Sequence, residues 1–260
     1  MIQDKVPLSV VVIVKNEEKR IADCLESIKW ADEIVVLDDM SEDKTVEVAK
    51  GYTDKVFQRK MDIEGRHRNY AYSLAKHKWV LSLDADERAT PELKDEIKEV
   101  IKSKDDHYGF AIPIRNYIGD YWIKYGGWYP SPQIRLFKKD HFKYEEAEVH
   151  PRIIMPDPRG VLKSDIIHYN YKDFEDALRK LNKQTTLEAA KWVRDKRKMT
   201  LFKALWRSVD RFIRRYFGKA GYKDGTIGLV LAVFSGTYQF LSYVKYWQRR
   251  QEVKIKGADA

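Results

Sequence analysis

The chain has 260 residues, 43% hydrophobic and 13% aromatic, enough for one sizeable core with an appendage. Its formal net charge of +9 favours an anionic partner, such as nucleic acid, a phosphorylated sugar or lipid headgroups. The single cysteine, Cys24, excludes an intrachain disulfide, and its helical context predicts a small core residue. The apolar N-terminal run is short and lacks a cleavage site, so we expect a first strand and no signal peptide.

The first hundred residues alternate between apolar runs and amphipathic segments. An apolar run covered on both faces is typical of a strand in a parallel sheet, and apolar residues at helical spacing predict a helix. The β-α-β-α-β-α-β order predicts a right-handed, doubly wound parallel sheet. The predicted strands lie in 8–16, 34–37, 54–60 and 79–87, and the helices between them in 17–31, 41–52 and 64–79.

Polar clusters follow three of these strands, and ligands of such sheets bind beyond the carboxyl ends of the strands. We therefore expect the clusters to face one crevice. The acids after the fourth strand repel one another unless a cation lies among them, which predicts a metal site; the alternative is a set of solvated loop acids. If the chain stays extended there, Asp84 and Asp86 point the same way. The clusters are Lys15-Asn16-Glu17, Asp38-Asp39 and Asp84-Ala85-Asp86, with Glu87 next in the chain.

Beyond a helix that begins at Pro91, the pattern changes. The β-branched and aromatic stretch 109–155 predicts antiparallel strands and long loops that extend the sheet. Its aromatic residues Trp122, Trp128 and Tyr129 suit either sugar stacking or burial. From residue 172 onward the chain is predicted to be helical and strongly basic.

The C-terminal region holds an uncharged stretch, 226–244, whose length approaches that of a membrane span of about 20 residues. Gly228, Gly236 and Gln239 dilute its hydrophobicity. Upstream, basic residues interleave with Leu, Trp and Phe at helical spacing in 201–217, as in an interfacial helix. We expect this region to lie on an anionic membrane leaflet; a true span and a packed helical lid are the alternatives.

Four stretches, in order, resemble the inverting glycosyltransferases of family 2, which have a GT-A fold: "LSVVVIVKNEE", "EIVVLDDMSEDKT", "GRHRNYAYSLAKHKWVLSLDADE" and "QIRLFKKD". Later strings, "VHPRI", "IIHYNY" and "GYKDGTIGL", are similar to one branch, the glucosyltransferases that build the lipopolysaccharide inner core. The resemblance implies an α/β, Rossmann-like mixed sheet flanked by helices, with a basic and aromatic helical extension. The catalytic domain would span 1–170, with a nucleotide-sugar half 1–100 and an acceptor-side half 101–170, and the helical region 171–260.

The resemblance also implies roles for individual residues. Asp86 would bind Mn²⁺ or Mg²⁺, with Asp84 on the metal or the ribose, and His150 or His168 would complete the metal shell or hold the diphosphate; each histidine is alternatively structural. Asp38 and Asp39 would contact uracil or ribose, or act as acids at a helix N-terminus. The remaining donor-site candidates are Asn16, Glu17, Arg66, Arg68 and Asn69, of which Arg68 and Asn69 match the family's pair.

The catalytic base is expected among Glu145, Glu146 and Glu148, with Glu146 first and Glu148 close behind. Where the branch has an acidic residue directly after the "VH" pair, this chain has Pro151. An alternative is that these glutamates are exposed acids of a hairpin.

The resemblance thus implies an inverting, metal-dependent hexosyltransferase that moves glucose from UDP-glucose to a saccharide acceptor such as an inner-core glycolipid. It would work in the cytoplasm, peripherally on the inner face of the cell membrane, with an oligomer possible and nucleic acid not a partner. One rival keeps the site and changes the acceptor to a polyprenyl phosphate. The other takes the basic, aromatic surface as nucleic-acid binding, which leaves the carboxylates at the strand ends unexplained.

Overall fold

The computed structural model describes the backbone of residues 6–103, 106–146 and 152–258, and their side chains as far as Glu252. The chain divides into two compact units. We call them the sheet unit, residues 1–115 and 130–169, and the helical unit, residues 116–129 and 170–260. The chain therefore passes between the units three times.

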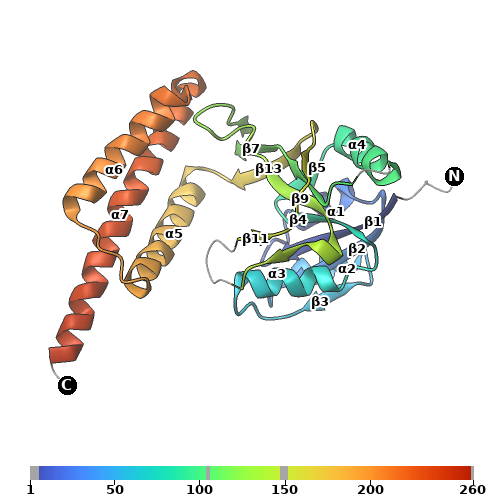
Figure 1. Ribbon diagram of the computed structural model, residues 1–260, viewed down its shortest axis with the longest axis horizontal. Coiled ribbons are helices and arrows are strands. Elements are labelled where there is room, and N and C mark those ends of the chain that lie inside the picture. Colours follow the sequence, from blue (N-terminus) through green and yellow to red (C-terminus); the bar gives the residue numbers. More distant parts are fainter. Residues whose placement is uncertain (1–5, 104–105, 147–151, 259–260) are drawn as a thin grey trace. The chain divides into compact units, whose positions relative to one another are not determined.

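A seven-stranded mixed sheet is the centre of the sheet unit (Figure 1). The first four strands of the chain are parallel and lie in the order β4-β1-β2-β3, as the β-α alternation predicts. Strand β9 is antiparallel to both β4 and β6, and β12 is parallel to β6, so the sheet is mixed. In spatial order the strands are β12 (Arg159–Val161), β6 (Gly109–Ile112), β9 (Gln133–Lys138), β4 (Trp79–Asp84), β1 (Val6–Val14), β2 (Ala31–Asp38) and β3 (Val56–Gln58).

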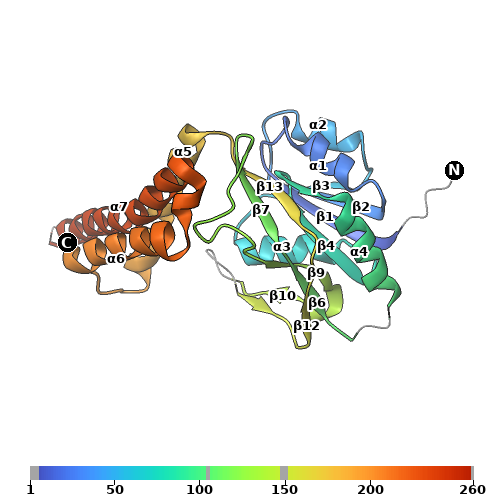
Figure 2. The same cartoon turned by 90° about the horizontal axis from the view of Figure 1, so that it is seen from above.

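Helices cover both faces of this sheet, as the doubly wound arrangement requires (Figure 2). One face packs on α1 (Ile21–Ser27), α2 (Thr45–Lys50) and α4 (Pro91–Lys102), and the other on α3 (Glu64–Ser73). The α/β class and the mixed, helix-flanked sheet are confirmed.

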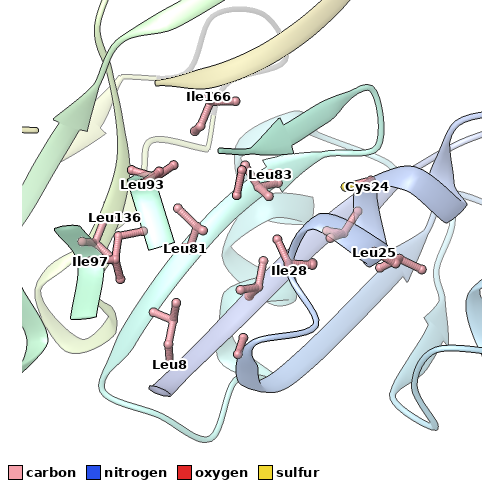
Figure 3. Close-up of a cluster of buried hydrophobic side chains, with 14 of the residues drawn as sticks. Leu8, Cys24, Leu25, Ile28, Leu81, Leu83, Leu93, Ile97, Leu136 and Ile166 are labelled. Carbon is pink, nitrogen blue, oxygen red and sulfur yellow. The ribbon is translucent and has the colours of Figure 1, made fainter. Parts of the chain in front are cut away.

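The larger core lies under α1, α2 and α4 and accounts for the near-continuous apolar runs of β1 and β4 (Figure 3). Cys24 is fully buried there, and burial raises the pKa of its thiol. A thiol in this environment stays protonated and unreactive, so the expectation of a small core residue is confirmed.

Short elements complete the sheet unit. Strand β5 (Glu87–Ala89) pairs antiparallel with β13 (Ile166–Tyr171), which places His168 opposite Glu87. Strand β10 (Lys143–Tyr144) pairs with β11 (Ile153–Ile154), and the 3₁₀ turn η1 (Lys139–His141) precedes β10.

The helical unit is built around α7 (Gly225–Ala258), with α5 (Phe174–Arg194) and α6 (Leu201–Ile213) packed along it (Figure 1). Strand β7 (Ile114–Ile118) forms a hairpin with β8 (Tyr121–Trp122). The π-helical turn η2 (Arg214–Gly218) and the 3₁₀ turn η3 (Gly221–Asp224) connect α6 to α7. Among the described residues, one helical stretch, Gly221–Glu252, has the length and composition of a membrane span, with a third of its most apolar window buried.

Candidate active site

The strand order reverses between β1 and β4, because α1 leads from β1 to β2 on one side and α3 returns the chain to β4 on the other. In open α/β sheets the crevice at the carboxyl ends of such strands is where ligands bind. Asp84 ends β4, Asp38 ends β2, and Asn16 follows β1 by two residues. The structure therefore brings the predicted polar clusters to this edge of the sheet.

The two acids at the end of β2, Asp38 and Asp39, are buried and held by different groups. The Asp38 carboxylate accepts hydrogen bonds from the Ser41 backbone N–H at 2.8 Å and the Gln58 amide at 3.1 Å. The Asp39 carboxylate accepts from the Lys15 ammonium at 2.9 Å and the Met61 backbone N–H at 2.7 Å. Burial opposes the ionisation of Asp39, but these two donors outweigh it and lower its pKa.

The turn after β1 is tied to the loop after β2. Asn16 has a left-handed backbone, with φ of 54°, which asparagine tolerates better than most residues. Its backbone N–H donates to the Ser41 hydroxyl at 2.8 Å, and its side-chain oxygen accepts from the Glu42 N–H at 2.9 Å. The Glu17 N–H donates to the Thr45 hydroxyl at 2.8 Å. These bonds hold the turn after β1 and the loop after β2 together at this edge of the sheet.

Asp84 lies between two arginines. The Arg68 guanidinium is 3.3 Å from one carboxylate oxygen and that of Arg135 is 3.2 Å from the other. Burial disfavours the charged carboxylate, yet the two arginines hold the pKa of Asp84 well below its usual range. Arg135 also bonds the buried Glu87 at 2.5 Å, and Glu87 accepts from the Asp84 N–H at 2.9 Å. Burial, followed by the charge of Asp84, raises the pKa of Glu87.

Asp86 faces a different set of partners. The chain turns at Ala85 and Asp86 instead of staying extended, so the condition on which Asp84 and Asp86 would point the same way is not met. The turn arises because Glu87 begins β5 and pairs with β13. The Asp86 carboxylate lies 3.5 Å from His168 Nε2 and 3.7 Å from the Arg20 guanidinium.

Arg20 connects Asp86 to the end of β1. Its guanidinium is 3.8 Å from the Glu17 carboxylate and donates to the Tyr169 carbonyl at 3.2 Å. Burial lowers the pKa of His168, but the hydrogen bond to Asp86 and the negative charges of Glu87 and Asp86 together raise it overall.

The segment that carries the candidate base is held by α3. The Asn69 amide donates to the Tyr144 carbonyl at 2.9 Å and accepts from the Tyr144 N–H at 2.8 Å. Arg66 binds Asp62 at 2.7 Å and Glu146 at 3.0 Å, both exposed. Glu145 is exposed as well. Glu148 and His150 lie outside the described residues.

Several polar residues of this edge have no counterpart in the sequence analysis, chiefly Arg20, His67 and Arg135. Arg135 lies in "QIRLFKKD", where its place within an apolar strand is the signal of a buried charge that needs a partner. His67 is fully buried, and neither ring nitrogen has a hydrogen-bond partner among the described residues. Its burial lowers its pKa.

The aromatic residues weighed for sugar stacking belong to the helical unit. Trp122 packs edge-on against Tyr129, with ring centroids 5.3 Å apart. Trp128 packs against Tyr171 and against a small cluster that contains Ile123 and Leu231. Trp128 is therefore partly buried, as the alternative to sugar stacking expects.

The model of glycosyl transferase family 2 matches residues 9–155, more than half of the chain. The chain therefore belongs to this family and is a glycosyltransferase, and its sheet is the GT-A sheet that the family resemblance implies. It is 25% identical over 94% of its length to the lipopolysaccharide core biosynthesis glycosyltransferase LpsC of Rhizobium meliloti, of which it covers 93%. It is 28% identical over 92% of its length to an uncharacterized glycosyltransferase of Rickettsia typhi, of which it covers 86%.

Among solved structures, that of residues 1–349 of Staphylococcus aureus TarS is 18% identical, with a TM-score of 0.47 over 94% of this chain and 91% of that one. The assignment of the fold rests on the strand order and the family match. Family membership implies a nucleotide-sugar donor and a saccharide acceptor.

Proposed function

We propose that the chain is an inverting, metal-dependent glycosyltransferase that moves glucose from UDP-glucose to a saccharide of a membrane-anchored glycolipid such as the lipopolysaccharide inner core. The observation that carries this proposal is the polar edge at the β1/β4 switch, where Asp84 lies between Arg68 and Arg135 and Asp86 lies beside His168. The lipopolysaccharide part rests on the likeness to LpsC over almost the whole of both chains. A glycolipid acceptor implies that the enzyme works from the cytoplasm at the inner face of the cell membrane.

The residues present fit a hard divalent cation bound together with its substrate. Asp86 Oδ2 and His168 Nε2 are 3.5 Å apart, a separation suited to two neighbouring ligands. Within the described ranges no group of three His, Cys, Asp or Glu side chains could hold an ion. Mg²⁺ and Mn²⁺ sites of this kind use one or two protein ligands, with phosphate oxygens and water for the rest. When bound, the ion would neutralise charge on the diphosphate leaving group.

The arginines and acids would bind the donor. Arg68 Nη1 and Arg135 Nε are buried without a hydrogen-bond partner among the described residues, so Arg68 can direct a free N–H toward a phosphate oxygen. Asp84, fixed between these arginines, would orient Arg68 and accept from a ribose hydroxyl. Asp38 and Asp39 would accept hydrogen bonds from the uracil and the ribose. Asn69 would act by holding Tyr144 in place.

Glu146 is our first choice for the base, with Glu148 second. The base takes the proton of the acceptor hydroxyl while that oxygen bonds to the anomeric carbon and the bond from this carbon to the diphosphate breaks, which inverts the configuration. Arg66, bonded to Glu146, would orient its carboxylate.

The direct test is transfer of labelled glucose from UDP-glucose to a purified inner-core glycolipid with Mn²⁺ present. We expect Glu146→Gln to lower kcat by about 100-fold or more, the range of general-base catalysis, and Glu145→Gln to have little effect. The proposal fails if no nucleotide sugar is consumed with any saccharide acceptor. Transfer to a polyprenyl phosphate that persists in Glu146→Gln would identify that lipid as the acceptor, since a phosphate nucleophile needs no strong base.

A further inference from the structure

Helix α6 presents an apolar stripe to solvent along its whole length. Phe202, Trp206, Val209 and Ile213 follow one another at spacings of four, three and four residues and so share one face of the helix. Phe202 is 78% exposed and Trp206 is 66% exposed, so neither side chain belongs to the core of the helical unit. We call these four residues the α6 stripe. Leu201, Leu205 and Phe217 are exposed beside it.

The opposite face of α6 is the one that packs on α7. Ala204 is fully buried. A Cβ added to Gly236 of α7 would lie 2.8 Å from the Ser208 carbonyl oxygen, so the two backbones approach closely there. Helix α6 therefore packs on α7 through its small residues, and its large apolar side chains stay exposed to solvent.

Basic residues border the stripe. Lys203, Arg207 and Arg214, four and seven residues apart, lie along one side of it. Between Leu201 and Gly218 there are five basic residues and one acidic residue, Asp210. The exposed loop before the helix adds Lys196, Arg197 and Lys198.

We propose that the α6 stripe inserts into the surface of an anionic lipid bilayer, with α6 parallel to the membrane plane. An apolar face with large aromatic residues and a basic border is the pattern of an interfacial helix, in which anionic headgroups neutralise the border. A second copy of this chain would bring an equally basic border against the first, which opposes pairing through this face.

The hydrogen bonds between α7 and α5 argue against α7 as a membrane span. Lys245 of α7 donates to the Asn182 carbonyl at 2.6 Å and to the hydroxyls of Thr185 and Thr186 at 2.8 Å, all on α5. A spanning α7 would have to carry α5, with its many charged residues, into hydrocarbon or lose these contacts, and either is unfavourable.

The test is co-sedimentation of the full chain with vesicles of phosphatidylcholine alone and of phosphatidylcholine mixed with phosphatidylglycerol. We expect binding to the anionic vesicles, weakened by salt and lowered about tenfold or more by the pair Phe202→Ser and Trp206→Ser. Trp247→Ser removes an aromatic residue of α7 that is 53% exposed and should leave binding unchanged. An unchanged helical circular-dichroism spectrum and unfolding temperature in each variant would show that the helical unit is folded, and this control does not depend on the proposed transfer reaction.

Three results would overturn the inference. They are no preference for anionic vesicles, an equal loss on Trp247→Ser, and a dimer in vesicle-free solution that the paired substitution dissociates. The last result would assign the stripe to a second copy of the chain.

Discussion

Arg135 is the buried cation on which two carboxylates at the end of β4 depend. It contacts Asp84 and Glu87, and Glu87 is fully buried. We expect Arg135→Ala to lower the free energy of unfolding by about 3–5 kcal/mol, because it leaves Glu87 buried without its cation. Urea unfolding measures this.

Arg66→Ala is the matched control, since Arg66 also contacts two carboxylates but is exposed together with them. It should lower the free energy of unfolding far less than Arg135→Ala, because solvent screens an exposed ion pair. Equal losses in the two variants would mean that burial does not distinguish the sites.

His67 gives the stability a pH dependence of known sign. Burial lowers its pKa in the folded state below the unfolded value of about 6.5, so the unfolded state binds the proton more readily. This contribution to stability is present above about pH 6.5 and is lost as the pH falls toward the folded pKa. His168, whose pKa is raised, acts in the opposite sense. It is present both in the wild-type protein and in the His67→Leu variant, so its effect cancels when the two are compared.

We therefore expect His67→Leu to reduce the loss of stability between about pH 7.5 and about pH 5, measured by urea unfolding at both pH values. A difference from the wild-type protein that is the same at both would refute the assignment of a neutral buried imidazole.

For individual residues, the sequence predicted the carboxylates of the site more readily than the cations that bind them. Asp38 and Asp84 stand where apolar strands end, which is a local signal. Arg135 binds Asp84 from 51 residues away, and no local pattern encodes such a pair.

Among the elements, the turn η3 and the start of α7 meet at Gly228. A Cβ there would lie 1.9 Å from the Gly221 carbonyl oxygen and 3.0 Å from Asp224 Cβ. Asp224 in turn accepts from the Tyr125 N–H at 2.8 Å. We expect Gly228→Ala to destabilise the helical unit by about 1–3 kcal/mol, because backbone must move.

Thermal unfolding followed by circular dichroism measures this effect. Gly218→Ala is the control, since the nearest side-chain atom to its added Cβ is Arg214 Cγ at 3.8 Å, an ordinary contact. A tolerated Gly228→Ala would show that the close approach of η3 to α7 is not required.

Asn69 couples α3 to β10. Asn69→Ala removes both hydrogen bonds to Tyr144 and should lower the free energy of unfolding by about 1–3 kcal/mol, with UDP affinity little changed. Parallel unfolding and UDP titrations separate the two effects. A loss of UDP affinity without a loss of stability would instead make Asn69 a direct ligand of the donor.

The elements themselves were predictable where one segment carries its own pattern. The strands β1, β2 and β4 are apolar runs, and α4 has Pro91 at its start with Thr90 capping it. Strand β5 was missed because it has three residues and forms through pairing with β13, about 80 residues later. The turn at Asp86 follows from that pairing and could not be read locally.

For the whole molecule, the order of segments predicted a doubly wound α/β sheet extended by antiparallel strands, and the family resemblance implied a mixed sheet. The strand order confirms the α/β class and the mixed sheet. The basic helical extension was likewise predicted from composition. The sequence predicted an interfacial helix in 201–217 and an uncharged stretch of nearly spanning length in 226–244, and it left a true span as an alternative. Our proposal assigns the membrane contact to α6 because its stripe is exposed and because α7 is bonded to α5. That distinction requires knowing which helix faces are covered.

The proposed function requires the edge at β1 and β4 to bind a nucleotide together with a divalent cation. The measurement that tests it most directly is calorimetric titration of UDP into the protein with and without Mn²⁺, on the wild type, on Asp86→Ala and on Asp157→Ala. Asp157 is an exposed acid, with its side chain 81% accessible and paired to Arg159, and serves as the control. We expect Mn²⁺-dependent binding of UDP that Asp86→Ala abolishes and Asp157→Ala preserves. Metal-independent binding, or binding that survives Asp86→Ala, would show that Asp86 does not hold a cation for the nucleotide.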